Sequence, residues 1–338
     1  VLDQITIHPS NWECKETIAD FIERYNVPCL YNVDTRAVTR AVRKYGVMKA
    51  IIVRDDTDEK IIQEKLAKEL HRDQVERVTA DKPYIYGHGT HKVSLLDCGL
   101  KKNILVSLAK NDCTVTVYPC HTTAAEMLAD NPDGIFLSPG PGDPLDVPYV
   151  ISTVKELIGK KPIFGICLGI QMLSLALGAH TFKLPFGHRG SNHPVKDLRT
   201  GRVYITSQNH GYAVSDEGLP ECIEVTHRSV NDGTIEGFCH KTLPIQAVQY
   251  HPEASPGPTD NFYLFKEFVK AMEERYKVYN ETMDQIEAME KSGEIFVIRP
   301  SRDPQIGRME KNPEKVKAVY DLGYKDACAQ MEALKAWL

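Results

Sequence analysis

The segment KPIFGICLGIQMLSLALG, residues 161–178, decides the fold. A short apolar strand is expected over 162–165 and a helix over 168–177, and between them GICLG has glycines two residues either side of Cys167. This spacing is typical of a sharp strand-to-helix turn that carries a nucleophile. The helix N-terminus lowers a thiol pKa there and offers backbone N–H groups to an anion. Cys167 is therefore a candidate nucleophile, although the turn alone leaves a buried structural cysteine equally open.

Apolar strands alternate with helices on the N-terminal side of this segment. Strands are expected over 92–97, 114–118 and 134–137, and helices over 101–110 and 122–129. Strands separated by helices of this length indicate right-handed crossovers and a parallel, doubly wound sheet. Such sheets bind ligands beyond the carboxyl ends of their strands, where Cys167 and the loop SPGPGDP, residues 138–144, both fall. The fold class is therefore α/β.

The residues before and after this alternating segment predict other patterns of secondary structure. After Gly178 the pattern predicts short strands, with hairpin turns at RTGR, residues 199–202, and NDG, residues 231–233, and a further strand over 244–250. Residues 1–82 predict a small α/β piece with one helix behind Asp34 or Thr35, a second behind Thr57 and a strand over 50–53. The turn-rich stretch 82–89 predicts a linker. Toward the C-terminus we expect a helix over 266–291, a short strand over 294–300 and a last helix from Asn312-Pro313.

Composition excludes several classes of protein. The 338 residues carry 41 Lys+Arg against 46 Asp+Glu, a formal charge of −5, which does not suit a basic nucleic-acid binder. No apolar run is long enough to span a bilayer, so no membrane association is expected. Nine cysteines without a C-x-x-C pair fit reduced thiols and a cytoplasmic location. Phosphate-binding and dinucleotide-binding glycine motifs do not occur, and His88 with His91 and His188 with His193 lack a neighbouring Cys or carboxylate, so no metal site is expected.

A thiolate nucleophile needs a base and a group that orients the base. QYHPEASPGP, residues 249–258, offers His251 and Glu253 after a predicted strand, and in extended backbone residues two apart project to the same side. Such a pair alone is more often a surface pair than a relay. An oxyanion site would need backbone donors, which the N–H groups of Leu168 and Gly140 can supply. The loop around Gly140, taken by itself, favours a plain tight turn.

Five motifs together resemble a known family: FGICLGIQ, SPGPGDP, FGHRGSNHPV, TSQNHGY and QYHPEASPGP, in this sequence at 164–171, 138–144, 186–195, 206–212 and 249–258. They are similar to the class I, triad-type glutamine amidotransferases. FGHRGSNHPV and HPEASPGP, with LDCGLKKNIL at 96–105 and VDTRAVTRAVRKYG at 33–46, resemble the small, glutaminase subunits of carbamoyl-phosphate synthetase within that family. The resemblance covers about residues 1–271.

The resemblance implies a fold, an activity and a set of site residues. The fold is a flavodoxin-like, mostly parallel sheet over 91–272, preceded by a partial small domain over 1–82. The activity is glutamine hydrolysis through a cysteine thioester, with ammonia passed to a large subunit for carbamoyl phosphate synthesis in the arginine and pyrimidine pathways. No cofactor is implied for this chain, since ATP and Mg²⁺ belong to the large subunit. The implied residues are Cys167 as nucleophile, His251 as base and acid, Glu253 as its orienting partner, Gly140 and Leu168 as oxyanion donors, and Gly140, Gly142, Leu168, Gln171, Asn209, Gly211 and Tyr212 as contacts to glutamine.

Three departures from the family pattern leave a rival hypothesis open. Ile170 stands where the family often has His, and residues 1–82 match only the later part of the family's N-terminal domain, without a serine that helps to hold glutamine. Residues 273–338 resemble instead the C-terminal segment of bacterial patatin-like phospholipases, but the chain has no G-x-S-x-G and hence no hydrolase nucleophile. We expect this tail to be mainly helical. The rival hypothesis is a weakly active or inactive chain that only docks on the large subunit.

Overall fold

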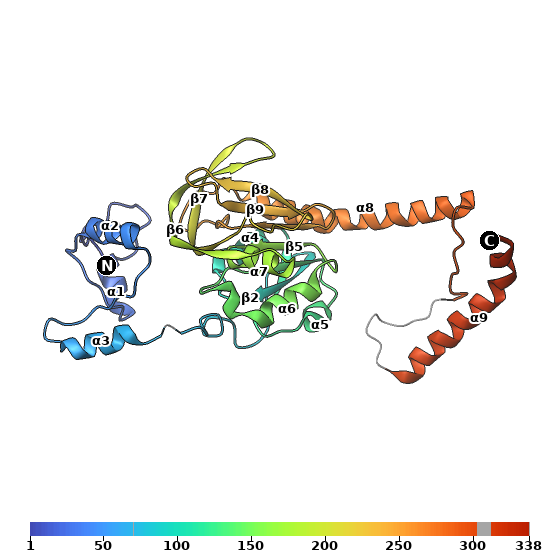
Figure 1. The fold of residues 1–338 in the computed structure, drawn as a ribbon, viewed down its shortest axis with the longest axis horizontal. Coiled ribbons are helices and arrows are strands. Elements are labelled where there is room, and N and C mark those ends of the chain that lie inside the picture. Colours follow the sequence, from blue (N-terminus) through green and yellow to red (C-terminus); the bar gives the residue numbers. More distant parts are fainter. Residues whose placement is uncertain (70, 303–311, 338) are drawn as a thin grey trace. The chain divides into compact units, whose positions relative to one another are not determined.

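A computed structural model of the chain describes residues 1–69, 71–302 and 312–337, without the side chains of 275–285 (Figure 1). These residues divide into two compact units, Val1–Met272 and Glu273–Leu338. The strands are β1 Tyr84–Tyr86, β2 His91–Asp97, β3 Cys113–Pro119, β4 Gly134–Leu137, β5 Ile163–Ile166, β6 Thr181–Asp197, β7 Val203–Val214, β8 Ile223–Ser229, β9 Ile235–His240 and β10 Ile245–Val248. The helices are α1 Ile18–Arg24, α2 Thr35–Tyr45, α3 Glu59–Ala67, α4 Lys102–Lys110, α5 Ala124–Leu128, the 3₁₀ helix η1 Pro144–Asp146, α6 Pro148–Leu157, α7 Leu168–Ala176, α8 Tyr263–Ser292 and α9 Pro313–Trp337.

A parallel half-sheet forms the centre of the first unit. β3, β2, β4, β5 and β10 lie side by side in this order, each parallel to its neighbour. Both faces of the sheet are buried: Ile135 and Leu137 of β4 belong to one hydrophobic cluster, with Val150 of α6, and Phe136 belongs to the other, with Phe265 of α8. Helices cover the sheet on both faces (Figure 1), as the alternation of strands and helices predicts. The mixed α/β class is confirmed.

Antiparallel strands after Gly178 close on themselves. β9, β7, β6 and β8 are joined in this order, and β8 also pairs with β9, so the four strands form a small closed barrel that continues the sheet from β10. The two expected turns are confirmed, because residues 199–202 connect β6 to β7 and residues 231–233 connect β8 to β9. The expectation of short strands was wrong for β6, which has 17 residues. Register shifts interrupt its pairing with β7, and such bulges let a long strand bend.

Three further expectations were wrong for one common reason. Residues 50–53 form no strand, and the described residues 1–69 and 71–83 contain three helices with turns and irregular segments but no strand, so the described part is helical rather than α/β. Residues 294–300 form no strand either. A strand requires a partner for its backbone groups, and no neighbouring strand is in place at either segment. In contrast, the presumed linker 82–89 contains β1, which pairs antiparallel with β3 at the edge of the sheet.

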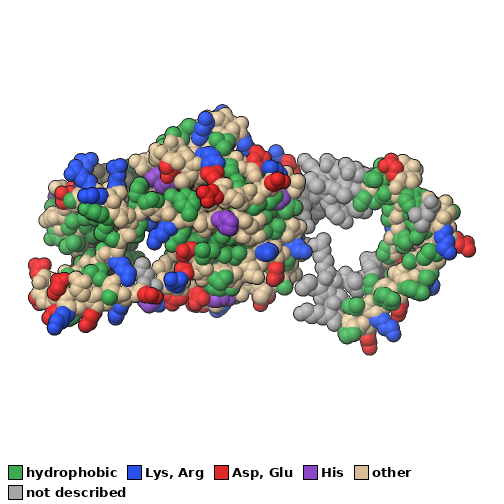
Figure 2. All heavy atoms as spheres, in the orientation of Figure 1, with side chains coloured by type: hydrophobic (Ala, Val, Ile, Leu, Met, Phe, Trp, Pro, Cys, Tyr) green, Lys and Arg blue, Asp and Glu red, His purple; other side chains and the backbone are tan. Residues whose placement is uncertain are grey.

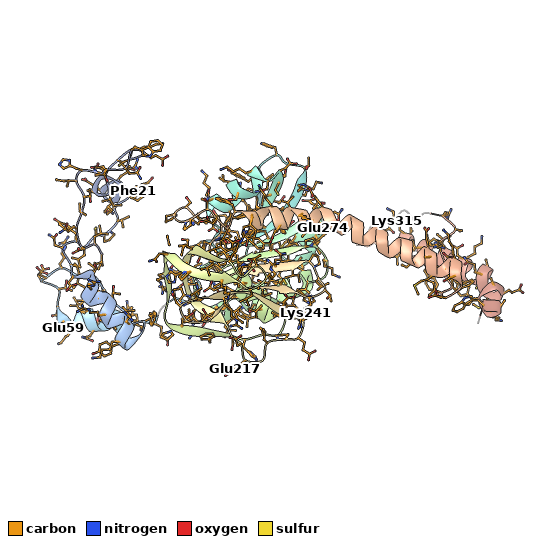
Figure 3. All side chains as sticks on the ribbon, turned by 90° about the horizontal axis from the view of Figure 1, so that it is seen from above. Phe21, Glu59, Glu217, Lys241, Glu274 and Lys315 are labelled. Carbon is orange, nitrogen blue, oxygen red and sulfur yellow. The ribbon has the colours of Figure 1, made fainter. Side chains whose placement is uncertain are left out.

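Packing differs between the parts of the chain. None of the residues of α1, α2 and α3 is buried, whereas α7 buries seven of its nine residues. Figure 3 shows the consequence, with side chains crowded around the sheet but spread around single helices near Phe21, Glu59 and Lys315. The site residues named above lie in the well-packed part, on β7, on α7 or in the loops and turns that follow β4, β5 and β10.

The described residues of the second unit form the later turns of α8, a segment without regular secondary structure over 293–302, and α9. The Asp326 carboxylate of α9 accepts a hydrogen bond from the backbone N–H of Ser301 at 2.8 Å, and the Trp337 ring donates to the Gly293 carbonyl at 2.8 Å. Tyr320 and Tyr324 on α9 are exposed, and hydrophobic side chains appear on the surface of this unit (Figure 2). None of the predicted site residues belongs to it.

Candidate functional site

Cys167 occupies the turn between β5 and α7. Its backbone has φ 55° and ψ −104°, a conformation that non-glycine residues rarely adopt. The glycines on either side make the turn possible: a Cβ on Gly169 would lie 2.6 Å from the Leu137 carbonyl oxygen, and one on Gly165 would lie 2.9 Å from the Gly169 carbonyl carbon. The strand and helix therefore approach more closely than any larger residue permits. Strain of this kind clusters at functional sites.

The base and its partner come from the neighbouring strand. β10 runs parallel to β5 with Val248 opposite Ile166, so the chain leaves both strands at the same sheet edge. The His251 ring lines the same pocket as Cys167, whose side chain helps to raise the imidazole pKa, and its Nδ1 lies 2.7 Å from Oε1 of Glu253. Residues 252 and 253 form a turn rather than the extended backbone that was expected. The two side chains meet because this turn folds Glu253 back beneath the ring.

The interactions of His251 with Cys167 and Glu253 favour the charged form of its imidazole. Burial lowers the pKa of His251, but the hydrogen bonds to Cys167 and Glu253 outweigh burial and raise this pKa to about 10. Glu253 is fully buried, and the imidazolium is its nearest compensating charge. The arrangement can therefore hold a thiolate, an imidazolium and a carboxylate in sequence.

The glycine loop of residues 138–144 lies against the same turn. A Cβ on Gly140 would lie 2.7 Å from the Leu168 side chain and 2.3 Å from the Cys98 carbonyl oxygen, so only glycine fits beside the turn between β5 and α7. Gly142 has φ +94°, a left-handed conformation that also favours glycine. The close approach places the backbone of the loop next to the N-terminus of α7.

The residues expected to contact glutamine surround Cys167 and His251. Gly140, Gly142, Gln171, Asn209, Gly211 and Tyr212 all line one pocket with these two side chains. Leu168 and Glu253 lie behind its wall and are buried. The Cys167 sulfur is 3.9 Å from the Asn209 carbonyl oxygen. The Gln171 amide nitrogen donates to the Tyr212 carbonyl and to Gln249 Oε1, which leaves its own oxygen to face other groups.

Lys101 and Asn103 support Glu253 and were not among the sequence predictions. Lys101 Nζ lies 3.4 Å from Glu253 Oε1 and also donates to the Ala254 carbonyl. The Asn103 side chain donates to the Glu253 carbonyl. Both residues lie at the start of α4, at the carboxyl end of β2. Their position within LDCGLKKNIL after a predicted strand was the available signal, because strand ends of one sheet converge.

Comparison with known families divides the chain into three matches. The sequence model for glutamine amidotransferase class-I matches residues 94–271. The model for the carbamoyl-phosphate synthase small chain, CPSase domain, matches residues 1–52, and a domain of unknown function (DUF6363) matches residues 265–338. Cys167, His251 and Glu253 all lie within the residues that match the glutamine amidotransferase model.

Individual proteins show the same likeness. The carbamoyl phosphate synthase small chain of Staphylococcus haemolyticus is 50% identical over 277 residues, covering 81% of this chain and 75% of that protein. The Bacillus cereus small chain is 48% identical over 274 residues with the same shares. The solved structure of a putative GMP synthase component from Thermoplasma acidophilum has a TM-score of 0.51 at 23% identity and covers 57% of this chain and 99% of its own. This last likeness concerns the fold alone.

No helix in the described part of the chain is long and apolar enough to cross a membrane.

Proposed function

Because this chain belongs to the carbamoyl phosphate synthase small chain family and contains a class-I glutamine amidotransferase domain, we propose that it hydrolyses glutamine at Cys167. The ammonia released is supplied for carbamoyl phosphate synthesis. The observation that carries the proposal is the continuous chain of contacts from Cys167 through His251 to Glu253, at the edge of a pocket lined by Gly140 and Asn209. The order of the five parallel strands, 2-1-3-4-5, supports a flavodoxin-like arrangement of this domain.

The first half of the reaction forms a thioester. The Cys167 sulfur attacks the γ-amide carbon of glutamine, and the electron pair of the C=O bond moves onto oxygen. When the carbonyl reforms, the C–N bond breaks and His251 delivers the proton that lets nitrogen leave as ammonia. Glu253 holds the ring so that one nitrogen faces the thiol and the other keeps its hydrogen bond.

The second half hydrolyses the thioester. His251, now neutral, takes a proton from water, and the hydroxyl oxygen attacks the same carbon. The C–S bond breaks, glutamate leaves, and the thiolate–imidazolium pair is restored. We assign the backbone N–H groups of Leu168 and Gly140 to the oxyanion of both tetrahedral intermediates, on the support of their close packing at the α7 N-terminus.

Substrate binding is assigned to the lining of the same pocket. Gly142, Gln171, Asn209, Gly211 and Tyr212 line it around Cys167. The Gln171 amide nitrogen is fixed by Tyr212 and Gln249, so its side chain presents a preorganised oxygen for the glutamine ammonium or amide.

Partner binding is proposed from the family alone: a large chain that uses ATP, Mg²⁺ and bicarbonate receives the ammonia, and this chain needs no cofactor for its own step. The cytoplasm is the proposed location.

Glutaminase activity of the purified chain, with and without an added large chain from a relative, tests the proposal. We expect glutamate and ammonia to form in equal amounts and to disappear in Cys167→Ser. A chain that binds the large partner yet releases no glutamate under either condition would instead establish the docking-only hypothesis. The intact contacts among Cys167, His251 and Glu253 do not favour that hypothesis, because a chain that only docks has no need of them.

A further inference from the structure

Three buried side chains from three strands of the closed barrel converge on one point. His188 lies on β6, His210 on β7 and Glu236 on β9, and their exposed fractions are 7%, 5% and 0%. One ring nitrogen of each histidine and one carboxylate oxygen all lie within 4.8 Å of one another. His188 and His210 are direct cross-strand partners in the β6–β7 register. The sequence does not reveal this cluster, since its members are 22 or more positions apart.

The positions of the hydrogens on the two rings follow from their outer partners. His210 Nδ1 lies 2.8 Å from the Tyr212 carbonyl oxygen, which can only accept, so this nitrogen carries the hydrogen. His188 Nε2 lies 2.8 Å from a carboxylate oxygen of Asp232 and likewise carries a hydrogen. In each neutral ring the remaining nitrogen presents a lone pair. These are Nε2 of His210 and Nδ1 of His188.

Both lone pairs face oxygen atoms that are themselves acceptors. His188 Nδ1 is 3.3 Å and His210 Nε2 is 3.9 Å from Glu236 Oε1. Gln208 donates its amide nitrogen to Glu236 Oε2 at 2.9 Å, which turns its oxygen toward His210 Nε2 at 2.6 Å. With both rings neutral and Glu236 ionised, four acceptor atoms meet in this buried space without a hydrogen between them. Such a group is unfavourable unless a positive charge lies among the atoms.

We propose that His188, His210 and Glu236 bind one divalent transition-metal cation of the Zn²⁺ class, with the Gln208 oxygen at a fourth position. Imidazole nitrogens and a carboxylate oxygen are ligands that Zn²⁺ prefers, at about 2.0–2.2 Å, which places tetrahedral ligands about 3.4 Å apart. The His188–Glu236 separation of 3.3 Å already has this value, and the His210–Glu236 separation of 3.9 Å requires a small contraction. The 2.6 Å contact between His210 Nε2 and the Gln208 oxygen has to widen by rotation of the Gln208 side chain. Hard cations such as Mg²⁺ prefer all-oxygen sites and do not suit the two imidazoles.

The outer contacts match those of metal-binding histidines. A ligating histidine almost always donates its other N–H to a carboxylate or a backbone carbonyl, and ligating carboxylates are hydrogen-bonded in turn. Asp232, the Tyr212 carbonyl and the Gln208 amide fill these three roles for His188, His210 and Glu236 respectively. A hydrogen-bonded network without metal would need additional protons on the rings instead.

The cation would join the barrel to the glutamine pocket. It would cross-link β6, β7 and β9, and His210 lies between Asn209 and Gly211, which line the pocket. Its role is structural, because the three protein ligands are buried and Cys167 is the nucleophile of the proposed reaction. An effect on glutamine binding rests on the proposed function, whereas metal binding itself is measured independently of it.

Metal binding is tested on the full chain with Zn²⁺ and Co²⁺ as probes. After treatment with a chelator and its removal, we expect one Zn²⁺ per chain by elemental analysis and calorimetry, and a rise in the unfolding temperature on Zn²⁺ addition. Co²⁺ in the same site should give visible d–d absorption bands of a tetrahedral N/O site. An absence of stoichiometric binding in the parent chain would overturn the proposal and leave a protonated hydrogen-bond network.

Variants decide where the metal is bound. Glu236→Gln keeps the shape and the hydrogen-bonding groups of the cluster but removes the anionic ligand, so Zn²⁺ affinity should fall by at least about 100-fold. His193→Ala is the matched control, because its ring packs 5.5 Å from that of His188 but supplies no ligand atom. Cys167→Ser excludes zinc held by the reactive thiol and should leave binding intact. Equal binding by Glu236→Gln and the parent, or loss of binding in Cys167→Ser, would contradict the assignment.

Discussion

The two carboxylate oxygens of Glu253 have different surroundings. Oε1 is 2.7 Å from His251 Nδ1 and 3.4 Å from Lys101 Nζ, whereas Oε2 is buried without a hydrogen-bond partner among the described residues. A buried carboxylate is costly unless it is paired. Lys101 therefore neutralises Glu253 and holds it beneath the imidazole, although Lys101 itself does not touch the thiol.

Lys101→Met should lower the turnover number for glutamine by about 10-fold without abolishing it, because the His251–Glu253 contact remains but loses its support. The KM for glutamine should change less than the turnover number. Steady-state glutaminase kinetics provide the measurement. Lys102→Met removes a charge from the adjacent, exposed position and should match the parent. A Lys101→Met enzyme with unchanged turnover would show that the ion pair has no positioning role.

Cys167→Ser tests the nucleophile. A hydroxyl has a far higher pKa than a thiol, so His251 activates it poorly and glutamine hydrolysis should fall on the order of 10⁴-fold. Cys239→Ser should keep the parent rate, since this thiol lies on β9 and burial raises its pKa. Mass spectrometry after labelling with a diazo-ketone analogue of glutamine should place the label on Cys167. A label on Cys98 or Cys239 would refute the assignment.

The raised pKa of His251 predicts a dependence of stability on pH. An unfolded histidine has a pKa of about 6.5, and the hydrogen bonds to Cys167 and Glu253 raise the folded value to about 10. Because the folded pKa is the higher one, this stabilisation is complete below about pH 6.5 and is lost as pH rises through about 10.

The measurement is the free energy of unfolding by urea, for the parent and for His251→Asn, at several values between about pH 7 and pH 10. The advantage of the parent should shrink steadily over this interval. Groups that do not interact with His251 cancel in the difference, so the measured change reports on His251 together with Cys167 and Glu253. A difference that does not change with pH would show that His251 titrates near its ordinary value.

At the scale of an element, the β5–α7 elbow depends on close contact. Gly169 lies in the first turn of α7, and a Cβ there would meet the Leu137 backbone of β4 at 2.6 Å. That contact is with backbone, so the neighbour cannot move aside without shifting the central sheet. The elbow is thus fixed by both its own strand and the next one.

Gly169→Ala should reduce stability by about 1–3 kcal/mol and should also lower activity, because relief of the clash displaces α7 from Cys167. Thermal unfolding and glutaminase assays measure the two effects. Gly323→Ala in α9 is the control: nothing lies within 4 Å of its added Cβ, and alanine favours a helix by about 1 kcal/mol over glycine. A Gly169→Ala chain as stable and active as the parent would mean that the elbow tolerates a wider spacing.

At the scale of the whole molecule, the division after Met272 separates the site from the tail. Phe265, Phe268 and Met272 of α8 belong to the hydrophobic core beneath the sheet, whereas every proposed site residue lies before them. The first turns of α8 are therefore structural elements of the amidotransferase unit. Residues from 273 onward form the second unit.

Deletion of residues 278–338 should leave folding and glutaminase activity within about two-fold of the parent, because no core residue is removed. Deletion of residues 263–338 should instead prevent cooperative folding, since four large buried side chains are lost: Leu264, Phe265, Phe268 and Met272. Circular dichroism, thermal unfolding and activity distinguish the two truncated chains. Loss of cooperativity in the shorter deletion would show that the tail is integral to the unit that carries the site.

The sequence by itself determined the class of fold, the elbow and the chemical types of the triad. Local periodicity is set by neighbours in the chain, so the strand–helix alternation up to α7 and the turns at 199–202 and 231–233 were predictable. The wrong predictions concerned two strands, at residues 50–53 and 294–300. Both segments have the composition of a strand, but a strand forms only where another strand supplies hydrogen bonds. That information is not local.

Only the tertiary structure determined which side chains lie close together at the strand ends and inside the barrel. The ion pair of Lys101 with Glu253 joins residues 152 positions apart, and the His188–His210–Glu236 cluster exists only because β6, β7, β8 and β9 close on themselves. Local pattern cannot encode such meetings, because register and closure depend on the packing of whole strands. The proposed nucleophile could thus be identified from a five-residue motif, whereas the charges that support its proposed base and the proposed metal ligands could be found only in the folded sheet.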